Sequence, residues 1–215
     1  MVSICIHGKT EEVVLFVGGG AIAARRLQLF VNEPCRLLVI SPVIDPTITE
    51  LVKTGRVEWR NACFNETDIE GLPQCRFVFA CTDNKPVNEL VAQVGRSHHK
   101  LVNRCDDSKD CDFSLPSTLQ LGNLEFSISA NGISPRVNKL IRQDMTNRYS
   151  ILQIALPSLK IMREDVKLLL SEPNERQKFW RTHLTIESLE AILSGEWQRI
   201  EGELHHAISS LRIKS

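Results

Sequence analysis

The sequence lacks several features that would assign a protein to a class at once. Its 26 Lys and Arg residues equal its 26 Asp and Glu residues, so the net charge of zero gives no support to a general role on nucleic acid or membrane surfaces. No apolar run approaches the roughly 20 residues of a membrane-spanning helix. The N-terminus has no basic leader before a long apolar segment. We therefore expect a soluble protein that uses a local basic patch for any polyanion.

Disulfide frameworks and compact metal sites are also missing. The seven cysteines are odd in number and form no C-x-x-C pair, which argues against a secreted disulfide scaffold and a zinc site. The adjacent pairs His98-His99 and His205-His206 point to different faces of a helix instead of forming an i, i+4 metal pair. We assign no metal ligand and expect a reducing, cytoplasmic environment.

What the sequence does contain is a regular alternation in its first half. With 215 residues and 42% hydrophobic composition, the chain can bury a sizeable core. Strand-like segments occur at 13–17, 36–41, 57–59, 77–82 and 101–103, and helix-like segments at 21–31, 46–54 and 86–97. This alternation is typical of a parallel sheet that is covered on both faces.

The pattern changes after residue 112. Residues 113–121 and 124–129 are strand-like on either side of a Gly122-Asn123 turn, and Ser134-Pro135 opens an amphipathic helix to about residue 147. From residue 157 the chain is helical, with breaks near 172–174 and 194–195. We predict three parts: an α/β domain (1–112), a small α+β unit (113–150) and a helical C-terminal domain (151–215).

The first strand ends in a glycine motif, Gly18-x-Gly20-x-x-Ala23. Gly18 allows a tight turn, Gly20 lets the backbone approach a pyrophosphate, and Ala23 allows close packing of the following helix on the sheet. The free N–H groups at the start of that helix face an anion. The motif predicts a Rossmann-like dinucleotide site, although a plain strand-to-helix turn has the same form.

Three further clusters follow predicted strands and should meet at the same sheet edge. They are Ser41-Pro42-Val43, Thr82-Asp83-Asn84 and Asn103-Arg104-Cys105-Asp106-Asp107. We assign Thr82, Asp83 and Asn103 to the cofactor.

The second strand does not end in the usual acidic residue, and no carboxylate follows before Asp45, so Ser41 and backbone groups are expected to hold the ribose. Arg25 and Arg26 would suit a 2′-phosphate, yet arginines early in an exposed helix are more often solvated. NAD is favoured over NADP.

The order of motifs resembles the precorrin-2 dehydrogenases, which include the dehydrogenase and ferrochelatase module of siroheme synthase. Five motifs over roughly residues 13–150 carry this resemblance: Val17 to Arg26 (VGGGAIAARR), Ala80 to Asn84 with Asn88, Val102 to Asp106 (VNRCD), Asp112 to Ser117 (DFSLPS) and Ser129 to Pro135 (SANGISP).

The resemblance implies NAD-dependent oxidation of precorrin-2 to sirohydrochlorin and, in some members, insertion of ferrous iron to give siroheme. It implies a homodimer, with the segment after residue 112 forming much of the subunit contact and the substrate cleft. It places the essential aspartate on Asp106 and further NAD contacts on Ala21, Ile22, Pro42 and Val43. Family members often have two apolar residues where this chain has Arg104-Cys105.

An aspartate suits this chemistry, because the tetrapyrrole loses a hydride and a proton. A carboxylate can accept a proton, steer a cationic intermediate or bind an incoming metal. The alternative is that Asp106 and Asp107 form a solvated turn with Asp110 and Asp112.

The eight carboxylates of precorrin-2 call for a local basic surface. The helix after Ser134 offers Arg136, Lys139, Arg142 and Arg148, and Arg104 and Lys109 lie near the expected reaction centre. We assign Arg104, Ser117, Arg136 and Lys139 to the substrate. The competing interpretation of the basic residues is an ordinary helix exterior.

Two other functions stay open. A non-enzymatic NAD-responsive sensor or tetrapyrrole carrier would bind the nucleotide without turnover, and Asp106 in its motif favours the enzyme instead. A dehydrogenase of another small substrate is disfavoured by the segment from Asp112 to Pro135, which a generic Rossmann enzyme does not need.

Overall fold

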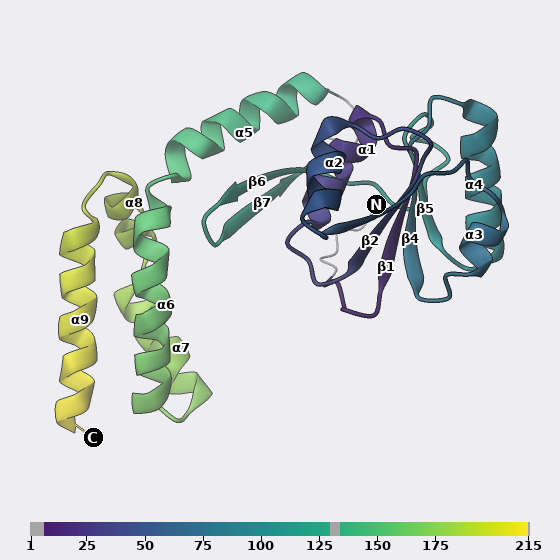
Figure 1. The fold of residues 1–215 in the computed structure, drawn as a ribbon. Helices are drawn as coiled ribbons and strands as arrows, with labels where there is room; N and C mark the ends of the chain where they lie inside the picture. The colour runs from purple at the N-terminus through teal and green to yellow at the C-terminus, as the bar shows by residue number, and fades with distance from the viewer. Residues whose placement is uncertain (1–6, 130–133, 215) are drawn as a thin grey trace. The chain divides into compact units, whose positions relative to one another are not determined.

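The computed structural model describes residues 7–129 and 134–214. The chain divides into two compact units, residues 1–115 (unit 1) and 116–215 (unit 2), and each is described by itself (Figure 1). Residues 130–133, which belong to the last of the five motifs, lie outside the described residues. No helix in the described part of the chain is both long and apolar enough to cross a membrane.

Unit 1 is built on a five-stranded parallel sheet, in which the order is β3-β2-β1-β4-β5 (Figure 1). The strands are β1 (Val13–Val17), β2 (Arg36–Ile40), β3 (Val57–Arg60), β4 (Cys75–Ala80) and β5 (Leu101–Arg104). All five residues of β1 are buried, which explains its unbroken apolar run, because a central parallel strand is covered on both faces. The predicted parallel sheet is confirmed.

Helices cover both faces of this sheet. Within β1, Val14 and Phe16 face α1 (Ala21–Leu27) and α2 (Pro46–Lys53), whereas Leu15 packs with α3 (Thr67–Glu70) and α4 (Lys85–Ser97). Successive strand residues point to opposite faces, so one strand supplies two cores.

Most boundaries in unit 1 differ from the expectation by a residue or less, and three differences are larger. The helix expected over 21–31 ends at Leu27 and continues as the 3₁₀ helix η1 (Gln28–Phe30). The strand β4 begins two residues earlier than expected, at Cys75, and the short helix α3 was not expected at all. Helix ends commonly tighten into a 3₁₀ turn, and a four-residue helix has too little periodicity to be recognised in a sequence.

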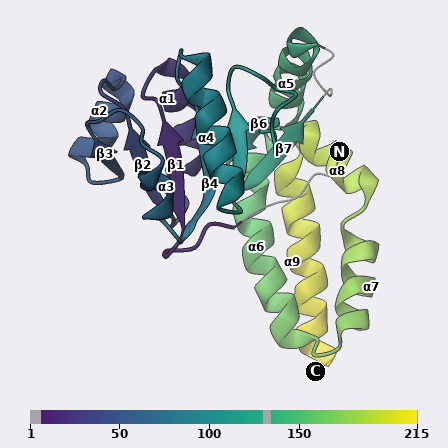
Figure 2. The same cartoon turned by 90° about the vertical axis from the view of Figure 1, so that its right-hand side faces the viewer.

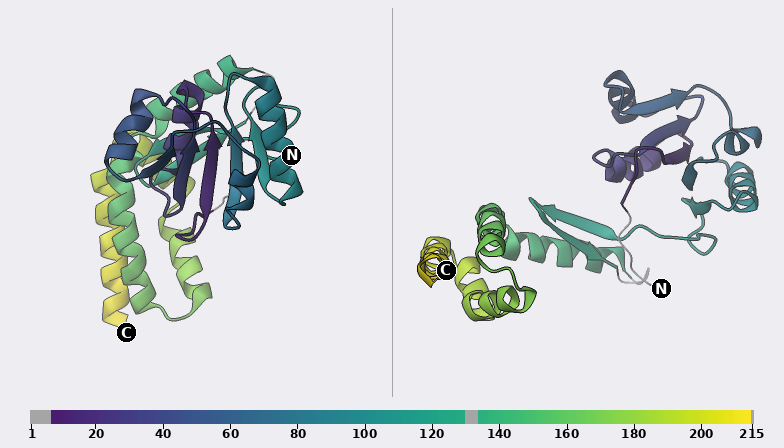
Figure 3. Two further views of the ribbon diagram at one scale, coloured as in Figure 1. Left: turned by 45° about the vertical axis from the view of Figure 1, so that its right-hand side comes forward. Right: turned by 90° about the horizontal axis from the view of Figure 1, so that it is seen from below.

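Unit 2 begins with an antiparallel hairpin of β6 (Ser117–Leu121) and β7 (Leu124–Ile128), beside which lies α5 (Pro135–Tyr149) (Figure 3). Gly122 adopts a φ of 59° in the two-residue turn, a conformation that favours glycine. Ser134 caps α5, as expected, because its hydroxyl accepts a hydrogen bond from the Val137 N–H at 3.3 Å.

The rest of unit 2 is helical, with α6, α7 and α9 lying side by side (Figure 2). The helices are α6 (Leu152–Leu169), α7 (Pro173–His183), α8 (Ile186–Leu193) and α9 (Trp197–Lys214). Phe179 and Trp197 are buried in the shared core. A break at Leu184-Thr185 was missed, although Thr185 and Ser188 form a capping box there.

Candidate functional site

The carboxyl ends of β1, β2, β4 and β5 carry every loop that the sequence analysis assigns to the cofactor or to catalysis in unit 1. The chain runs from β1 to β2 on one side, and β4 lies on the other side of β1. Loops that leave neighbouring parallel strands in opposite directions leave a crevice between them, where open α/β sheets bind their ligands.

Gly18 and Gly19 bring three loops into close contact. Gly18 has a φ of 100°, and a Cβ added to it would lie 2.6 Å from the Cys81 carbonyl oxygen. A Cβ on Gly19 would lie 2.5 Å from the Val43 carbonyl oxygen. No larger side chain fits at either position without moving the backbone, so these two glycines let the ends of β1, β2 and β4 converge.

Gly20 differs from them, because no atom of the described residues lies within 4 Å of a Cβ built at this position. It is the N-cap of α1, and no side chain caps the helix there. Among the described residues, no serine or aspartate oxygen therefore caps the first N–H groups of α1. An open approach to uncapped N–H groups fits a pyrophosphate, which accepts hydrogen bonds from such groups.

The loop after β2 is held by its own serine. The Ser41 hydroxyl donates a hydrogen bond to the Val43 carbonyl at 2.7 Å, and the Ser41 carbonyl accepts one from the Trp59 indole at 2.9 Å. Ser41 is buried, whereas Pro42 and Val43 are exposed. The nearby Asp45 carboxylate accepts a hydrogen bond from the Thr47 N–H and so caps α2.

Asn88 organises the loop after β4. Its side chain is fully buried and accepts hydrogen bonds from the Thr82 N–H (3.1 Å) and hydroxyl (2.7 Å), while its own amide donates to the Thr82 carbonyl (3.0 Å). Asp83 is exposed beside it. Asn88 belongs to one of the five motifs but had no predicted role, and the Thr82-x5-Asn88 spacing is the local signal for this contact.

Asn103 joins two elements behind the crevice. Its amide donates to the Phe113 carbonyl at 2.7 Å, and its oxygen accepts a short hydrogen bond from the Arg26 guanidinium. Arg26 is thereby engaged inside unit 1, whereas Arg25 is exposed. Arg26 is separated from Asn103 by 77 positions, so no local pattern indicated this pair.

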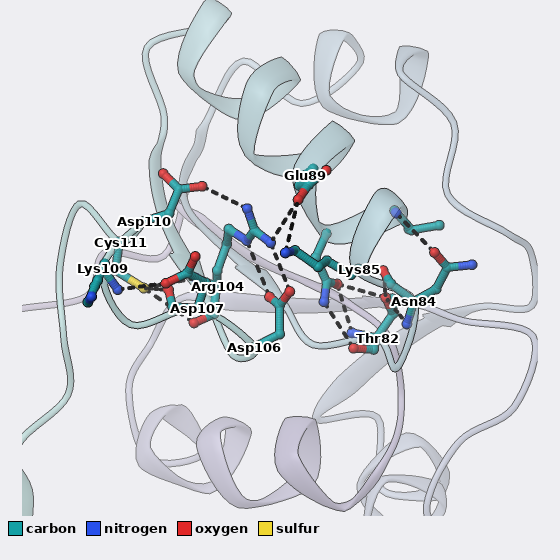
Figure 4. Close-up of polar contacts among 12 residues, drawn as sticks. Thr82, Asn84, Lys85, Glu89, Arg104, Asp106, Asp107, Lys109, Asp110 and Cys111 are labelled. Carbon is teal, nitrogen blue, oxygen red and sulfur yellow. Dashed lines mark hydrogen bonds and ion pairs between the residues drawn. The ribbon is translucent and has the colours of Figure 1, made fainter.

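Arg104 holds the Asp106 carboxylate with two hydrogen bonds, from Nη2 (2.8 Å) and Nε (3.2 Å) (Figure 4). The same guanidinium donates to Asp110 at 2.8 Å and lies 3.7 Å from Glu89. Its side chain is only 4% exposed, compared with 26% for that of Asp106. A guanidinium in this position orients Asp106 instead of meeting a ligand at the surface.

These contacts set the charge of Asp106. The hydrogen bonds from Arg104 are the largest influence on its pKa and lower it below the ordinary value, against a smaller opposing effect of burial. The same contact with Asp106 raises the pKa of Arg104. Asp106 is therefore an ionised carboxylate at neutral pH, suited to stabilising a positive charge and poor at retaining a proton.

The other aspartates of this loop build its shape. Asp112 accepts hydrogen bonds from the Val102 N–H at 2.9 Å and from Arg96 at 3.0 Å, which ties the loop to the free edge of β5. Asp107 accepts one from the Lys109 N–H at 3.0 Å. Asp110 is held by both Arg96 and Arg104, whereas Asp106 accepts two hydrogen bonds from the single guanidinium of Arg104 and stays partly exposed.

Unit 2 holds the remaining residues that were assigned to the substrate. The Ser117 hydroxyl accepts a hydrogen bond from Arg142 at 3.3 Å. Arg136 and Lys139 are exposed on α5. A separate cavity of about 600 Å³ lies between α6 and α7, and the described residues that line it include four cationic side chains and no acidic one. Its walls are Leu159, Arg163, Lys167, Arg176, Gln177, Trp180, Arg181 and Leu184.

Comparison with known protein families assigns unit 1. Residues 6–117 match the family model described as "Putative NAD(P)-binding", which covers more than half of the chain. The chain belongs to this NAD(P)-binding family. Residues 159–208 also match the model of the "Sirohaem synthase dimerisation region".

Individual relatives agree with this assignment. The chain is 31% identical to Siroheme synthase 1 of Aeromonas salmonicida over 191 residues and 31% identical to the Siroheme synthase of Methylococcus capsulatus over 197 residues. These alignments cover 86% and 90% of this chain, but the chain spans only 40% of each relative. The resemblance predicted from the five motifs is confirmed.

A solved structure supports the fold. "SirC, precorrin-2 dehydrogenase" superposes with a TM-score of 0.78 at 22% sequence identity, over 96% of this chain and 100% of that one. The Rossmann-like sheet followed by a helical C-terminal region is therefore the architecture of a known protein.

Proposed function

We propose that this protein is an NAD-dependent dehydrogenase that oxidises precorrin-2 to sirohydrochlorin. The observation that carries the proposal is the meeting of two features at one sheet edge: the open glycine loop of an NAD(P)-binding family and a carboxylate, Asp106, oriented by a buried arginine. The siroheme synthases among the relatives and the precorrin-2 dehydrogenase of the same fold indicate the substrate class.

NAD binds along the crevice in this proposal. The backbone at Gly18, Gly20, Ala21 and Ile22 receives the pyrophosphate, and Ser41, Pro42 and Val43 line the ribose side. Thr82, Asp83 and Asn103 border the loops on the far side of β1. The cofactor supplies a hydride acceptor when bound. NAD is preferred to NADP because Arg26 is engaged by Asn103 and only Arg25 is left exposed at this helix.

Asp106 acts on the charge of the substrate. Loss of a hydride leaves a positive charge on the tetrapyrrole, and loss of a proton then completes the oxidation. An ionised carboxylate near the reacting carbon stabilises that charge. Because its pKa is lowered, Asp106 passes the proton on to water instead of retaining it. Arg104 was also expected to bind the substrate, but in this proposal it positions Asp106 instead. The contact with substrate carboxylates is left to Ser117, Arg136 and Lys139.

A homodimer is the proposed assembly, and α6 offers a surface for it. Ile154, Ile161 and Leu168 are 62%, 67% and 86% exposed and recur every seven residues, which places them on one face of the helix. Two of the three fall in the segment that matches the dimerisation model, residues 159–208. Burial against a second copy would remove this apolar stripe from water.

The proposed dimer is tested by placing acidic residues on the apolar stripe of α6. Ile161→Asp with Leu168→Asp should shift the particle mass in light scattering from two chains to one, because paired carboxylates cannot be buried without partners. Ile213→Asp is the matched control, since Ile213 is 87% exposed and lies beyond the matched segment. An unchanged mass in the double variant would remove α6 from the interface.

We also infer a cytoplasmic location, because the described cysteines are all free thiols.

Ferrous iron is a second candidate substrate, for which Asp106 is the available carboxylate.

The assay follows from the proposal. Enzymatically generated precorrin-2 is mixed anaerobically with the protein and NAD, and the sirohydrochlorin spectrum is followed before and after addition of ferrous iron. NAD-dependent turnover is expected, and Asp106→Asn should lower kcat by about a hundredfold or more while the protein remains folded. Absence of turnover with both NAD and NADP, with nucleotide still bound, would favour the sensor or carrier.

A further inference from the structure

Two cysteines meet at the carboxyl ends of β4 and β5, and neither has a role in the proposed reaction. The Sγ atoms of Cys81 and Cys105 lie 2.6 Å apart. We propose that this pair is a modification site, at which a peroxide joins the two sulfurs in a reversible disulfide beside Asp106.

The backbone places both residues for such a bond. Ala80 and Arg104 are paired in register, and each cysteine is the next residue along its chain. The Cys105 N–H donates to the Ala80 carbonyl at 2.9 Å, so the parallel ladder continues to this point. Neighbouring strands lie about 4.8 Å apart, which falls inside the range of Cα separations that disulfides span. Both side chains face the α1 side of the sheet.

The environment distinguishes this pair from the other described thiols. The hydrogen bond from Cys81 lowers the pKa of Cys105, and the nearby Arg26 and Arg25 lower it further. Burial raises the pKa of Cys35, and it raises that of Cys75 to about 11. These effects outweigh the burial of Cys105, which acts in the opposite direction on its pKa. Cys105 is also partly exposed, whereas Cys81 is buried. Because peroxide must reach the sulfur and the thiolate is the reactive form, Cys105 is the nucleophile and Cys81 the resolving thiol.

The reaction balances with peroxide as the oxidant. The Cys105 thiolate attacks one peroxide oxygen, which breaks the O–O bond, releases hydroxide and gives a sulfenic acid. The Cys81 sulfur then attacks the sulfenic sulfur, the S–S bond forms, and water leaves with the thiol proton. Two thiols and one hydrogen peroxide thus become one disulfide and two waters, and a dithiol reductant reverses the change.

The bridge would lie between the two parts of the proposed active site. The backbone of Cys81 is the one that Gly18 contacts closely, and Cys105 immediately precedes Asp106. Joining the sulfurs pulls the start of the Asp106 loop toward the end of β4. If the proposed function holds, oxidation should lower turnover several-fold, and dithiothreitol should restore it.

The test uses the full chain, hydrogen peroxide and non-reducing tryptic peptide mapping. Trypsin separates Cys81 (peptide 77–96), Cys105 (105–109) and Cys111 (110–136). We expect a loss of about 2 Da per chain and a crosslink between peptides 77–96 and 105–109 that disappears with dithiothreitol. This readout needs no substrate, so it stands or fails separately from the proposed dehydrogenase.

Variants complete the test. Cys105→Ser and Cys81→Ala should each abolish the crosslink, and Cys105→Ser should make turnover insensitive to peroxide. Cys63→Ser is the matched control, because Cys63 is exposed and should leave the crosslink intact. A gain of oxygen on Cys105 without a crosslink, or a crosslink from Cys81 to Cys111, would overturn the assignment.

Discussion

The two units bury different kinds of side chain. Among the described residues, the buried polar side chains are Ser41, Asn88, Asn103 and Arg104, and all four belong to unit 1, three of them at the carboxyl ends of its strands. Both units expose some large apolar side chains, but in unit 2 they gather along two helices, as Val137, Leu140 and Ile141 on α5 and as the stripe on α6. Buried polar groups need fixed partners, so they mark a built site, whereas exposed apolar groups mark a surface that awaits a partner.

The largest expected effect tests whether the site of unit 1 is rigid. Gly18→Ala should destabilise unit 1 by about 3 kcal/mol or more, because it combines a positive φ with a Cβ against the Cys81 carbonyl. Gly20→Ala should cost less than about 1 kcal/mol, because its Cβ enters open space, yet it should weaken NAD binding.

Denaturant unfolding and NAD titration measure the two effects separately. If both alanines destabilised unit 1 equally, the distinction between a packing glycine and a ligand-facing glycine would be lost.

The second-largest effect concerns the contact between Arg104 and Asp106 in unit 1. Loss of the Arg104 hydrogen bonds in Arg104→Met should raise the pKa of Asp106, which is lowered in the native protein. Ionised Asp106 adds stability that is present above the pKa of this group in the unfolded chain and is lost as the pH falls through its lower folded pKa. In the variant the two pKa values lie closer together, so this pH-dependent contribution to stability becomes smaller. The acid limb of the pH profile of kcat should also move to a higher pH, because it follows the pKa of Asp106.

Two further variants make this test specific. Arg104→Lys keeps a charge without the paired geometry and should give an intermediate shift. Arg96→Met is the matched control, because Arg96 contacts Asp110 and Asp112 but not Asp106. An acid limb that moved equally in the Arg96 variant would show that total charge, and not the paired contact, sets the pKa.

The smallest effect tests which cations of unit 2 serve the substrate. Charge reversal at Arg136 and Lys139 should raise the KM for precorrin-2 several-fold with little change in kcat, because in the proposed function these residues bind carboxylates away from the reacting carbon. Reversal at Arg163 and Arg181 of the α6–α7 cavity changes the same number of charges and should leave KM unchanged. The opposite result would move the substrate contact from α5 to that cavity.

Local patterns predicted much of this protein. The alternation of buried apolar strands with helices, the glycine motif after β1 and the Ser134 cap each depend on neighbouring residues, and each is found in the structure. Boundaries were less accurate where no local signal exists, as at the 3₁₀ helix after Leu27 and at the short α3. The C-terminal helical region was also expected to begin at residue 157, whereas α6 begins at Leu152 and contains Pro157.

The sequence by itself thus determined most of the order of elements and the loops that gather at the sheet edge, and it predicts Asp106 as the carboxylate of the site. Only the tertiary structure decided that Arg104 is buried behind Asp106, that Arg26 is engaged by Asn103 and that Cys81 faces Cys105. The physical reason is that element formation depends on propensity and period along the chain. The charge and reactivity of a side chain depend on burial and on partners that arrive from other strands and helices.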